Sequence, residues 1–275
     1  MQIKFHGSRG SIPAPGIDTI KYGGNTSCVE FVSDEGQRII IDAGTGIRKI
    51  NRTQFNDKIL LFFSHSHWDH LQGLPFFNQI FNPDARIEIL LNARYYDGIK
   101  SDLLKQMSGK SFPIQFDSLP CDIKFIKIEE KYEIDSNLYV EVFENAHPGG
   151  SSAIKIVNKN KIFTFSTDNE ISIMKERKTY DNFVKFCSNS TILAHDAQYL
   201  DAEMKNKKGW GHSSIQDVCD LLIESQIQTG FFTHHDPERT DDQIDDFENI
   251  IAEKISRSGR LTTLSGAREE DVIEI

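Results

Sequence analysis

Apolar residues in this chain fall mostly into short runs, which predicts a structure rich in strands. Ile59–Phe63 is apolar throughout, as expected of a strand buried on both faces, whereas other runs alternate with polar residues. The remaining predicted strands are Gln2–Phe5, Cys28–Val32, Arg38–Ile41, Arg86–Leu91, Asp122–Ile128, Leu138–Phe143, Ser152–Val157, Lys161–Phe165, Thr191–Ala194, Phe231–Thr233 and Asp271–Ile275, the last of which could close a sheet edge.

Helical patterns separate these strands. They predict helices at Tyr95–Met107, Tyr180–Cys187, Ile215–Ser225 and Asp241–Ile255, a short helix from about Ile47, and an aromatic helix at Leu71–Phe81. Ser213 or Ser214 could cap the helix that starts at Ile215. With strands early and late and helices between them, two sheets with helices outside form the expected architecture. We find no linker, repeat or low-complexity stretch, so residues 1–275 are predicted to form a single domain.

Several predicted strands end at a histidine or an aspartate. His65, His147, Asp168, His195 and His234 each follow such a strand within a few residues. If these strand ends face one rim of the sheets, the side chains meet there, where loops carry chemistry on a rigid scaffold.

The richest of these positions is His65-Ser66-His67-Trp68-Asp69-His70, in which three histidines and one aspartate stand close together. Imidazoles and carboxylates are the ligands that suit zinc and its first-row neighbours. Four potential ligands exceed what one ion needs when others come from elsewhere in the chain. The motif therefore predicts half of a site for two divalent metal ions, with Zn, Mn and Fe all compatible.

The remaining ligands can be assigned to the two ions. His65 and His67 would bind the first ion together with His147, and Asp69 and His70 would bind the second together with a late histidine. Asp168 could bridge both ions with its two oxygens. Ions about 3.5–4 Å apart activate water for attack on a carbonyl or a phosphorus atom. Of the adjacent His234 and His235, one is expected not to be a ligand.

Composition limits the partners of such a site. The formal net charge is −10 among 275 residues, which argues against a broad grip on long nucleic acid but allows a small anionic substrate held by metal ions. The apolar runs are too short to span a membrane, and we see no signal peptide. The four cysteines are widely spaced, which favours a reduced, cytoplasmic protein.

The motif His65-Ser66-His67-Trp68-Asp69-His70 is similar to the signature of the metallo-β-lactamase superfamily. The resemblance implies an α/β (α+β) fold, a four-layered αβ/βα sandwich with a binuclear metal site at one rim. The closer match is to the phosphodiesterase branch, which includes ribonuclease Z. It rests on three stretches, His195-Asp196-Ala197-Gln198-Tyr199, Gly211-His212-Ser213-Ser214 and Phe232-Thr233-His234-His235-Asp236-Pro237.

The resemblance also implies roles. Pro237 aligns with the branch's proline, which favours His234 over His235 as the ligand. His212 would donate a proton to the leaving oxygen, with Asp196 orienting it, and Asp69 would belong to the catalytic set as well as to the ligands. This histidine separates phosphodiester cleavage from lactam or thioester hydrolysis.

The resulting functional hypothesis is a phosphodiesterase acting on a small phosphodiester such as a cyclic nucleotide. Asp196 replaces the glutamate of ribonuclease Z, and we find no Gly/Pro-rich arm of the kind that ribonuclease Z uses to hold tRNA. The alternatives are an RNA-processing nuclease like ribonuclease Z, a thioester, lactone or lactam hydrolase on the same site, and a metal-binding protein without activity. The apolar Leu74–Phe81 segment is a candidate homodimer face.

Other residues have simpler interpretations beside a functional one. Arg9, Lys207 and Lys208 could hold a substrate phosphate, although solvated loop charges explain them as well. Phe112 and Phe116 could line a base pocket, but core packing is the simpler role. His6 is expected to be structural, and His195 either supports the core or a ligand.

Overall fold

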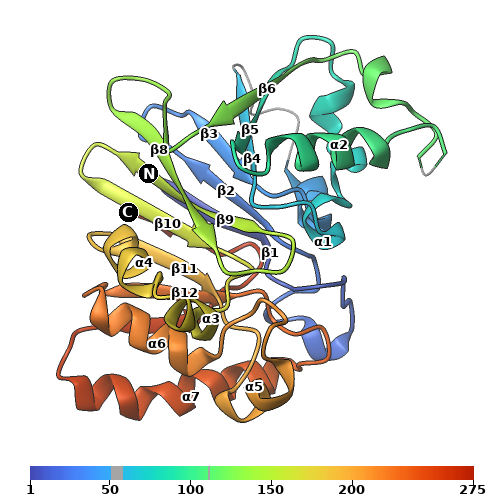
Figure 1. The fold of residues 1–275 in the computed structure, drawn as a ribbon. Helices are drawn as coiled ribbons and strands as arrows, with labels where there is room; N and C mark the ends of the chain where they lie inside the picture. The colour runs from blue at the N-terminus through green and yellow to red at the C-terminus, as the bar shows by residue number, and fades with distance from the viewer. Residues whose placement is uncertain (51–57, 111) are drawn as a thin grey trace.

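The computed structural model describes residues 1–50, 58–110 and 112–275 of the chain. Within these residues the strands form two sheets of seven strands each (Figure 1). In spatial order the first sheet contains β14 (Val272–Glu274), β1 (Gln2–Gly7), β2 (Cys28–Val32), β3 (Arg38–Ile41), β4 (Ile59–Phe63), β5 (Arg86–Asn92) and β6 (Asp122–Ile128). The second contains β13 (Thr263–Gly266), β12 (Thr229–Thr233), β11 (Ile192–Asp196), β10 (Lys161–Ser166), β9 (Ser151–Asn158), β8 (Leu138–Asn145) and β7 (Lys131–Glu133).

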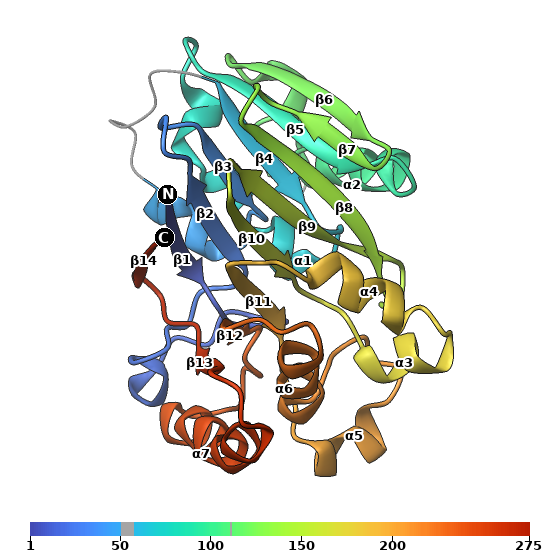
Figure 2. The same ribbon diagram turned by 90° about the vertical axis from the view of Figure 1, so that its left-hand side faces the viewer.

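Helices lie on the outer sides of the two sheets, as Figure 1 and Figure 2 show. The first sheet carries α1 (Trp68–Leu71) and α2 (Tyr96–Gln106). The second carries α3 (Ile171–Glu176), α4 (Tyr180–Cys187), α5 (Asp201–Lys207), α6 (Ile215–Glu224) and α7 (Asp241–Ser258). Ser214 caps α6 by accepting a hydrogen bond from the backbone N–H of Asp217, which agrees with one of the two predicted caps.

Three buried apolar clusters hold these layers together. The central cluster packs the facing sides of the two sheets, and one outer cluster lies between each sheet and its helices. In β4, Leu60 and Phe62 point into the central cluster while Leu61 and Phe63 point outward, because successive side chains of a strand face opposite sides. The uninterrupted apolar run of β4 is thus explained, and the predicted four-layered αβ/βα sandwich is confirmed.

The two ends of the chain meet at one edge of the first sheet. β14 pairs antiparallel with β1 in the register Gln2–Glu274, and the N and C labels lie near each other in Figure 2. The prediction that the last residues close a sheet edge is therefore confirmed. In the parts of the chain that the structure describes, no helix combines the length and apolar character needed to cross a membrane.

The prediction of a helix at Leu71–Phe81 is wrong. α1 ends at Leu71, and short 3₁₀ turns follow at Leu74–Phe76 and Asn78–Phe81. Pro75 sits in the first of these turns and cannot donate the backbone hydrogen bond that a continuous α-helix needs. Leu74, Phe77 and Ile80 are buried, and Phe76 is exposed, so the predicted dimer face offers less apolar surface than a free helix.

Among the described residues, the strands β7 and β13 and the helices α1, α3 and α5 were not predicted from the sequence. The region of α5 looked like a polar loop because the helix buries no residue and has no apolar stripe. Its N-terminus is instead held by Glu203, whose side chain accepts a hydrogen bond from the Leu200 backbone N–H. Near Ile47 the predicted helix is a 3₁₀ turn, Thr45–Lys49.

Candidate active site

The strand ends that carry histidines and aspartates face one rim. β10, β11 and β12 are parallel neighbours, and β8 has the same direction because it is separated from β10 by one antiparallel strand, β9. The loops after β8, β10 and β12 bring His147, Asp168 and His234 to the loop after β4, which carries the histidine motif. These side chains therefore lie together at one rim, as the sequence predicted.

One group of potential ligands contains His65, His67, His147 and Asp168, whose candidate ligand atoms all lie within 4.8 Å of one another. His67 Nδ1 is 3.0 Å from His147 Nε2. Asp168 Oδ2 is 3.6 Å from Nε2 of both His65 and His147. These are the four residues that the sequence assigned to the first ion, including its bridge.

A second group contains Asp69, His70 and His234, again within 4.8 Å of one another. Asp69 Oδ2 lies 3.2 Å from His70 Nε2 and 3.1 Å from His234 Nε2. Asp168 Oδ1 is 3.2 Å from both of these nitrogens. One oxygen of Asp168 therefore faces each group, which is the arrangement that a bridging carboxylate needs.

The buried histidines are held with Nε2 pointing inward. Nδ1 of His70 contacts Asp42 Oδ2 at 2.7 Å, and Nδ1 of His147 contacts the Gly211 carbonyl at 3.0 Å. Nδ1 of His234 lies 3.2 Å from Gln198 Oε1. Such outer contacts fix the tautomer and the ring orientation of histidines that bind metals.

The inward-facing atoms fit divalent metal ions. His65 Nε2 and His70 Nε2 are buried and have no hydrogen-bond partner among the described residues, although unpaired buried polar atoms are costly. Each faces a different oxygen of Asp168, and one cation in each group would satisfy the lone pair of its histidine. The donors are imidazole nitrogens and carboxylate oxygens, which suit Zn, Mn or Fe.

The charges of the site compensate one another. Burial alone would lower the pKa of His234, but the Asp168 and Asp69 carboxylates outweigh it and raise this pKa to about 9. Burial opposes ionisation of Asp168, yet the imidazoles of His234 and His70 bring its pKa well below the usual value. The pKa of His65 is lowered by burial and by the neighbouring His70. The carboxylates thus favour positive charge at the centre of the site, whether protons or metal ions carry it.

His212 lies beside both groups. Its Nδ1 is 2.6 Å from Asp196 Oδ2, so this contact does not engage the other ring nitrogen, Nε2. Its ring stacks on His234 with centroids 4.9 Å apart and lies 5.5 Å from the ring of His147. The structure therefore brings together the predicted pair of His212 and Asp196, next to the predicted ligands.

Sequence reasoning missed the residues that support the ligands from outside. Asp42 accepts hydrogen bonds from the Ser64 backbone N–H at 2.8 Å and from the Ser64 hydroxyl, besides its contact with His70. The Ser11 backbone N–H donates to Asp69 Oδ2 at 2.8 Å. Asp42 directly follows β3, so the rule of a polar residue at a strand end could have found it.

The prediction for Arg9 is wrong. Arg9 is fully buried and donates to the backbone carbonyls of Gly23, Asp236 and Arg239, so it is neither a solvated charge nor a free phosphate ligand. It ties the loop after β1 to the loop after β12. Lys208 instead agrees with the simpler expectation, because it is an exposed loop charge that pairs with Glu176 at the surface.

The other residues singled out in the sequence take the simpler roles. His6 pairs with Glu30 at 3.0 Å, and His195 lies 3.0 Å from the Asn169 side chain. His235 Nε2 contacts the Ala267 carbonyl, and burial lowers its pKa to about 3. Phe112 and Phe116 pack in the outer cluster of the first sheet. Lys207 lies over the ring of Trp210, 3.9 Å from its centroid.

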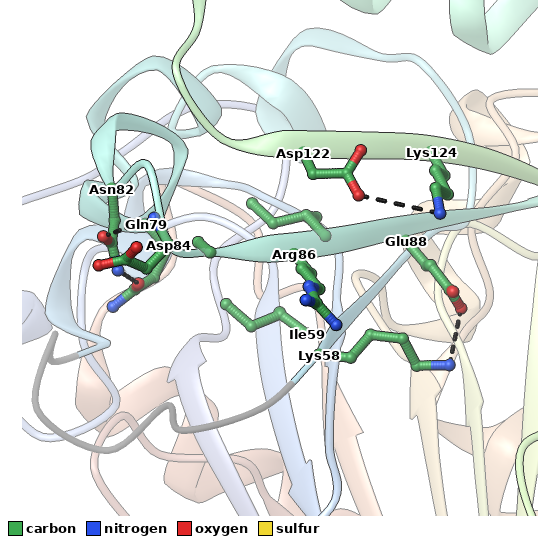
Figure 3. A pocket seen from close by; sticks show the side chains of 11 residues that line it. Lys58, Ile59, Gln79, Asn82, Asp84, Arg86, Glu88, Asp122 and Lys124 are labelled. Carbon is green, nitrogen blue, oxygen red and sulfur yellow. Dashed lines mark hydrogen bonds and ion pairs between the residues drawn. The ribbon is translucent and has the colours of Figure 1, made fainter.

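A cavity of about 730 Å³ lies at the opposite ends of the strands, where β4, β5 and β6 begin. Figure 3 shows its charged lining, in which Lys58 pairs with Glu88 at 2.9 Å and Lys124 approaches Asp122 at 3.8 Å. Because much of this lining charge is paired within the cavity, we assign it no ligand.

Known proteins with similar sequences and structures point to one fold. Ribonuclease Z of Picrophilus torridus is 23% identical over 278 residues, covering 85% of each chain. The metallo-β-lactamase fold protein YhfI from Bacillus subtilis superposes with a TM-score of 0.67 at 13% identity and covers 99% of both chains. Zn²⁺-bound PqqB from Methylobacterium extorquens gives a TM-score of 0.68 at 13% identity and covers 100% of both.

A family match extends over most of the chain. The family described as Anti-Pycsar protein Apyc1 matches residues 22–255, which include the His65–His70 motif, His147, Asp168, His212 and His234. The chain therefore belongs to the Anti-Pycsar protein Apyc1 family, as a metal-dependent hydrolase of the metallo-β-lactamase superfamily.

Proposed function

We propose that this protein is a binuclear phosphodiesterase that acts on a small phosphodiester such as a cyclic nucleotide. His65, His67 and His147 would hold one divalent ion, Asp69, His70 and His234 would hold the other, and Asp168 would bridge them. Two ions in such a site activate water and stabilise the charge that develops on a phosphoryl group.

The observation that carries the proposal is the pairing of His212 with Asp196. The 2.6 Å contact at Nδ1 orients the ring, so that Nε2 can donate a proton. An alkoxide leaving from phosphorus needs that proton, because it is a strong base. A thioester hydrolase, which expels a weakly basic thiolate, has less use for such a donor.

The surface near the site supports a nucleotide-like substrate. Trp68 and Trp210 are 61% and 55% exposed, and each lies within two residues of a site histidine. Exposed indole rings are suitable platforms for stacking a nucleobase. The net charge of −10 is unfavourable for long RNA but matters less for a small anion bound at metal ions.

A ribonuclease Z-like activity on RNA is the second candidate. It is favoured by the similarity to ribonuclease Z of Picrophilus torridus, which extends over 85% of both chains. The two candidates share the same chemistry at the site. They differ in the part of the substrate that binds outside the metal site, which is small for a cyclic nucleotide and large for an RNA.

A direct assay distinguishes these functions. The purified protein, loaded with Zn or Mn, is tested on 3′,5′-cyclic nucleotides, on bis(p-nitrophenyl) phosphate and on a tRNA precursor with a 3′ trailer. We expect turnover of a cyclic nucleotide. Cleavage of the precursor without turnover of any cyclic nucleotide would favour the RNA-processing candidate.

The His212→Ala variant tests the chemistry. General acid catalysis contributes about 10²–10⁴-fold, so a loss of this size is expected for an alkoxide leaving group. p-Nitrophenolate leaves without a proton, and its release should fall much less. Metal content per chain is the control, since about two ions must remain bound for the comparison to be valid. An equal loss on both substrates would contradict the proposed role.

A further inference from the structure

Glu170 is a buried carboxylate outside the predicted ligand and proton-donor set. Its side chain is fully buried, although a buried charge is costly unless hydrogen bonds satisfy it. The backbone N–H groups of Gly209 and Gly211 each donate to it at 2.9 Å, and the Ser172 hydroxyl donates at 2.9 Å. Glu170 thus anchors the loop between α5 and α6.

The conformation of this loop is adapted to that anchor. Gly209 has φ +84° and Gly211 has φ +93°, a backbone region that favours glycine. The two left-handed residues turn alternate amide groups toward the same carboxylate. A Cβ atom at Gly211 would lie 1.9 Å from His147 Nδ1, so the loop also packs directly against a predicted ligand.

The anchored loop ends at the proposed proton donor. His212 follows Gly211, and the Gly211 carbonyl accepts the hydrogen bond from His147 Nδ1 at 3.0 Å. Glu170 itself lies two residues after the bridging Asp168, and the intervening Asn169 accepts a hydrogen bond from the Ala146 backbone N–H at 2.9 Å. One short segment therefore fixes three parts of the site relative to one another.

We propose that Glu170 is a positioning residue, whose carboxylate holds the Gly209–Gly211 loop and thereby places His212 against the leaving oxygen of the substrate. This inference rests on the proposed role of His212 as a proton donor. In Glu170→Gln the new NH₂ group faces the Gly209 N–H in either orientation, because that N–H donates to both carboxylate oxygens, and an NH₂ group cannot accept it. The bonds that the remaining oxygen accepts from the loop lose their charge assistance and weaken, so the loop next to His212 is held less firmly.

The test compares Glu170→Gln with two control variants. Ser172→Ala removes a donor to the same carboxylate but leaves both loop amides bound. Glu176→Gln makes the same chemical change in the surface pair with Lys208, at the start of the same loop. Turnover is measured on the best 3′,5′-cyclic nucleotide and on bis(p-nitrophenyl) phosphate, together with metal content. Hydrogen–deuterium exchange is followed over residues 207–212.

We expect Glu170→Gln to lower cyclic nucleotide turnover by about tenfold or more, within the range of acid catalysis, and turnover of the p-nitrophenyl ester by less than about threefold. Exchange over residues 207–212 should rise while metal content stays unchanged, and both controls should behave like the wild type. In the His212→Ala background, Glu170→Gln should add little, because both changes remove one function.

Equal losses on both substrates, or unchanged turnover on both, would overturn the role of Glu170. If Glu170→Gln fails to fold, Glu170→Asp, which keeps the charge but shortens the reach, is measured by the same criteria. A His212→Ala variant without a selective loss on the cyclic nucleotide would instead show that the proposed function has failed. The two failures are therefore separated by the His212→Ala measurement.

Discussion

The contact between Asp42 and His70 leads to a quantitative prediction about metal affinity. The Asp42 carboxylate is fully buried and lies 2.7 Å from His70 Nδ1 through Oδ2, while Oδ1 accepts the Ser64 backbone N–H at 2.8 Å. In Asp42→Asn the amide oxygen can keep the bond to Ser64. Its NH₂ group then replaces Oδ2 and faces the N–H group at His70 Nδ1.

Two donors in contact force a change at His70. The ring can move its proton to Nε2, but a protonated Nε2 cannot bind a metal ion. Loss of such a supporting contact costs about 10- to 100-fold in metal affinity, which corresponds to about 1.4–2.8 kcal/mol. A hydrogen bond to a charged group contributes about 1.5–3 kcal/mol, so the two magnitudes agree.

Metal affinity is measured by competition with a chromophoric chelator, and the number of ions per chain by elemental analysis. We expect Asp42→Asn to weaken binding of the ion proposed at Asp69, His70 and His234 more than binding of the ion proposed at His65, His67 and His147. Thermal unfolding in excess Zn gives an independent readout, because metal that binds only the folded chain raises its stability.

Ser27→Ala is the matched control. The Ser27 hydroxyl lies 3.4 Å from the same Asp42 oxygen, but it does not touch His70. Its removal should leave metal affinity within about twofold of the wild type, since the contact is long and weak. A folded Asp42→Asn variant that binds both ions as tightly as the control would refute the reasoning.

Three further predictions concern the loop, a helix cap and the thiols. Gly211→Ala should bind fewer metal ions per chain by elemental analysis, because its Cβ would collide with His147; full occupancy would contradict the observed packing. Thr240→Ala should lower the free energy of unfolding by about 1 kcal/mol in denaturant titrations, because the Thr240 hydroxyl caps α7; no change would show that the cap is dispensable. The cysteines are buried, and burial raises their pKa values, to about 11 for Cys219, so they should react with a thiol reagent at pH 8 only after unfolding. Fast reaction of the folded protein would contradict this.

Much of the fold was predictable because its core strands have strong local patterns. β2, β3, β4 and α4 have the predicted boundaries, since apolar runs and periodicity mark them clearly. α5 and the 3₁₀ turns after α1 were not predictable, because neither has an apolar stripe of helical period. Their conformations depend on capping contacts and on Pro75.

The sequence by itself was enough to predict the candidate ligands and their grouping. His65, His67, Asp69 and His70 stand in one motif, and the other ligand candidates follow apolar strands, so spacing and strand ends were enough to propose the site. The tertiary structure decided which residues outside the site hold the candidate ligands in their orientation. Asp42, Gln198, Gly211 and Glu170 come from separate loops, and although Asp42 directly follows a strand, the sequence does not show which site residue each of them contacts. Hydrogen bonds between residues far apart in the chain depend on how the layers pack, which is why only the folded structure reveals them.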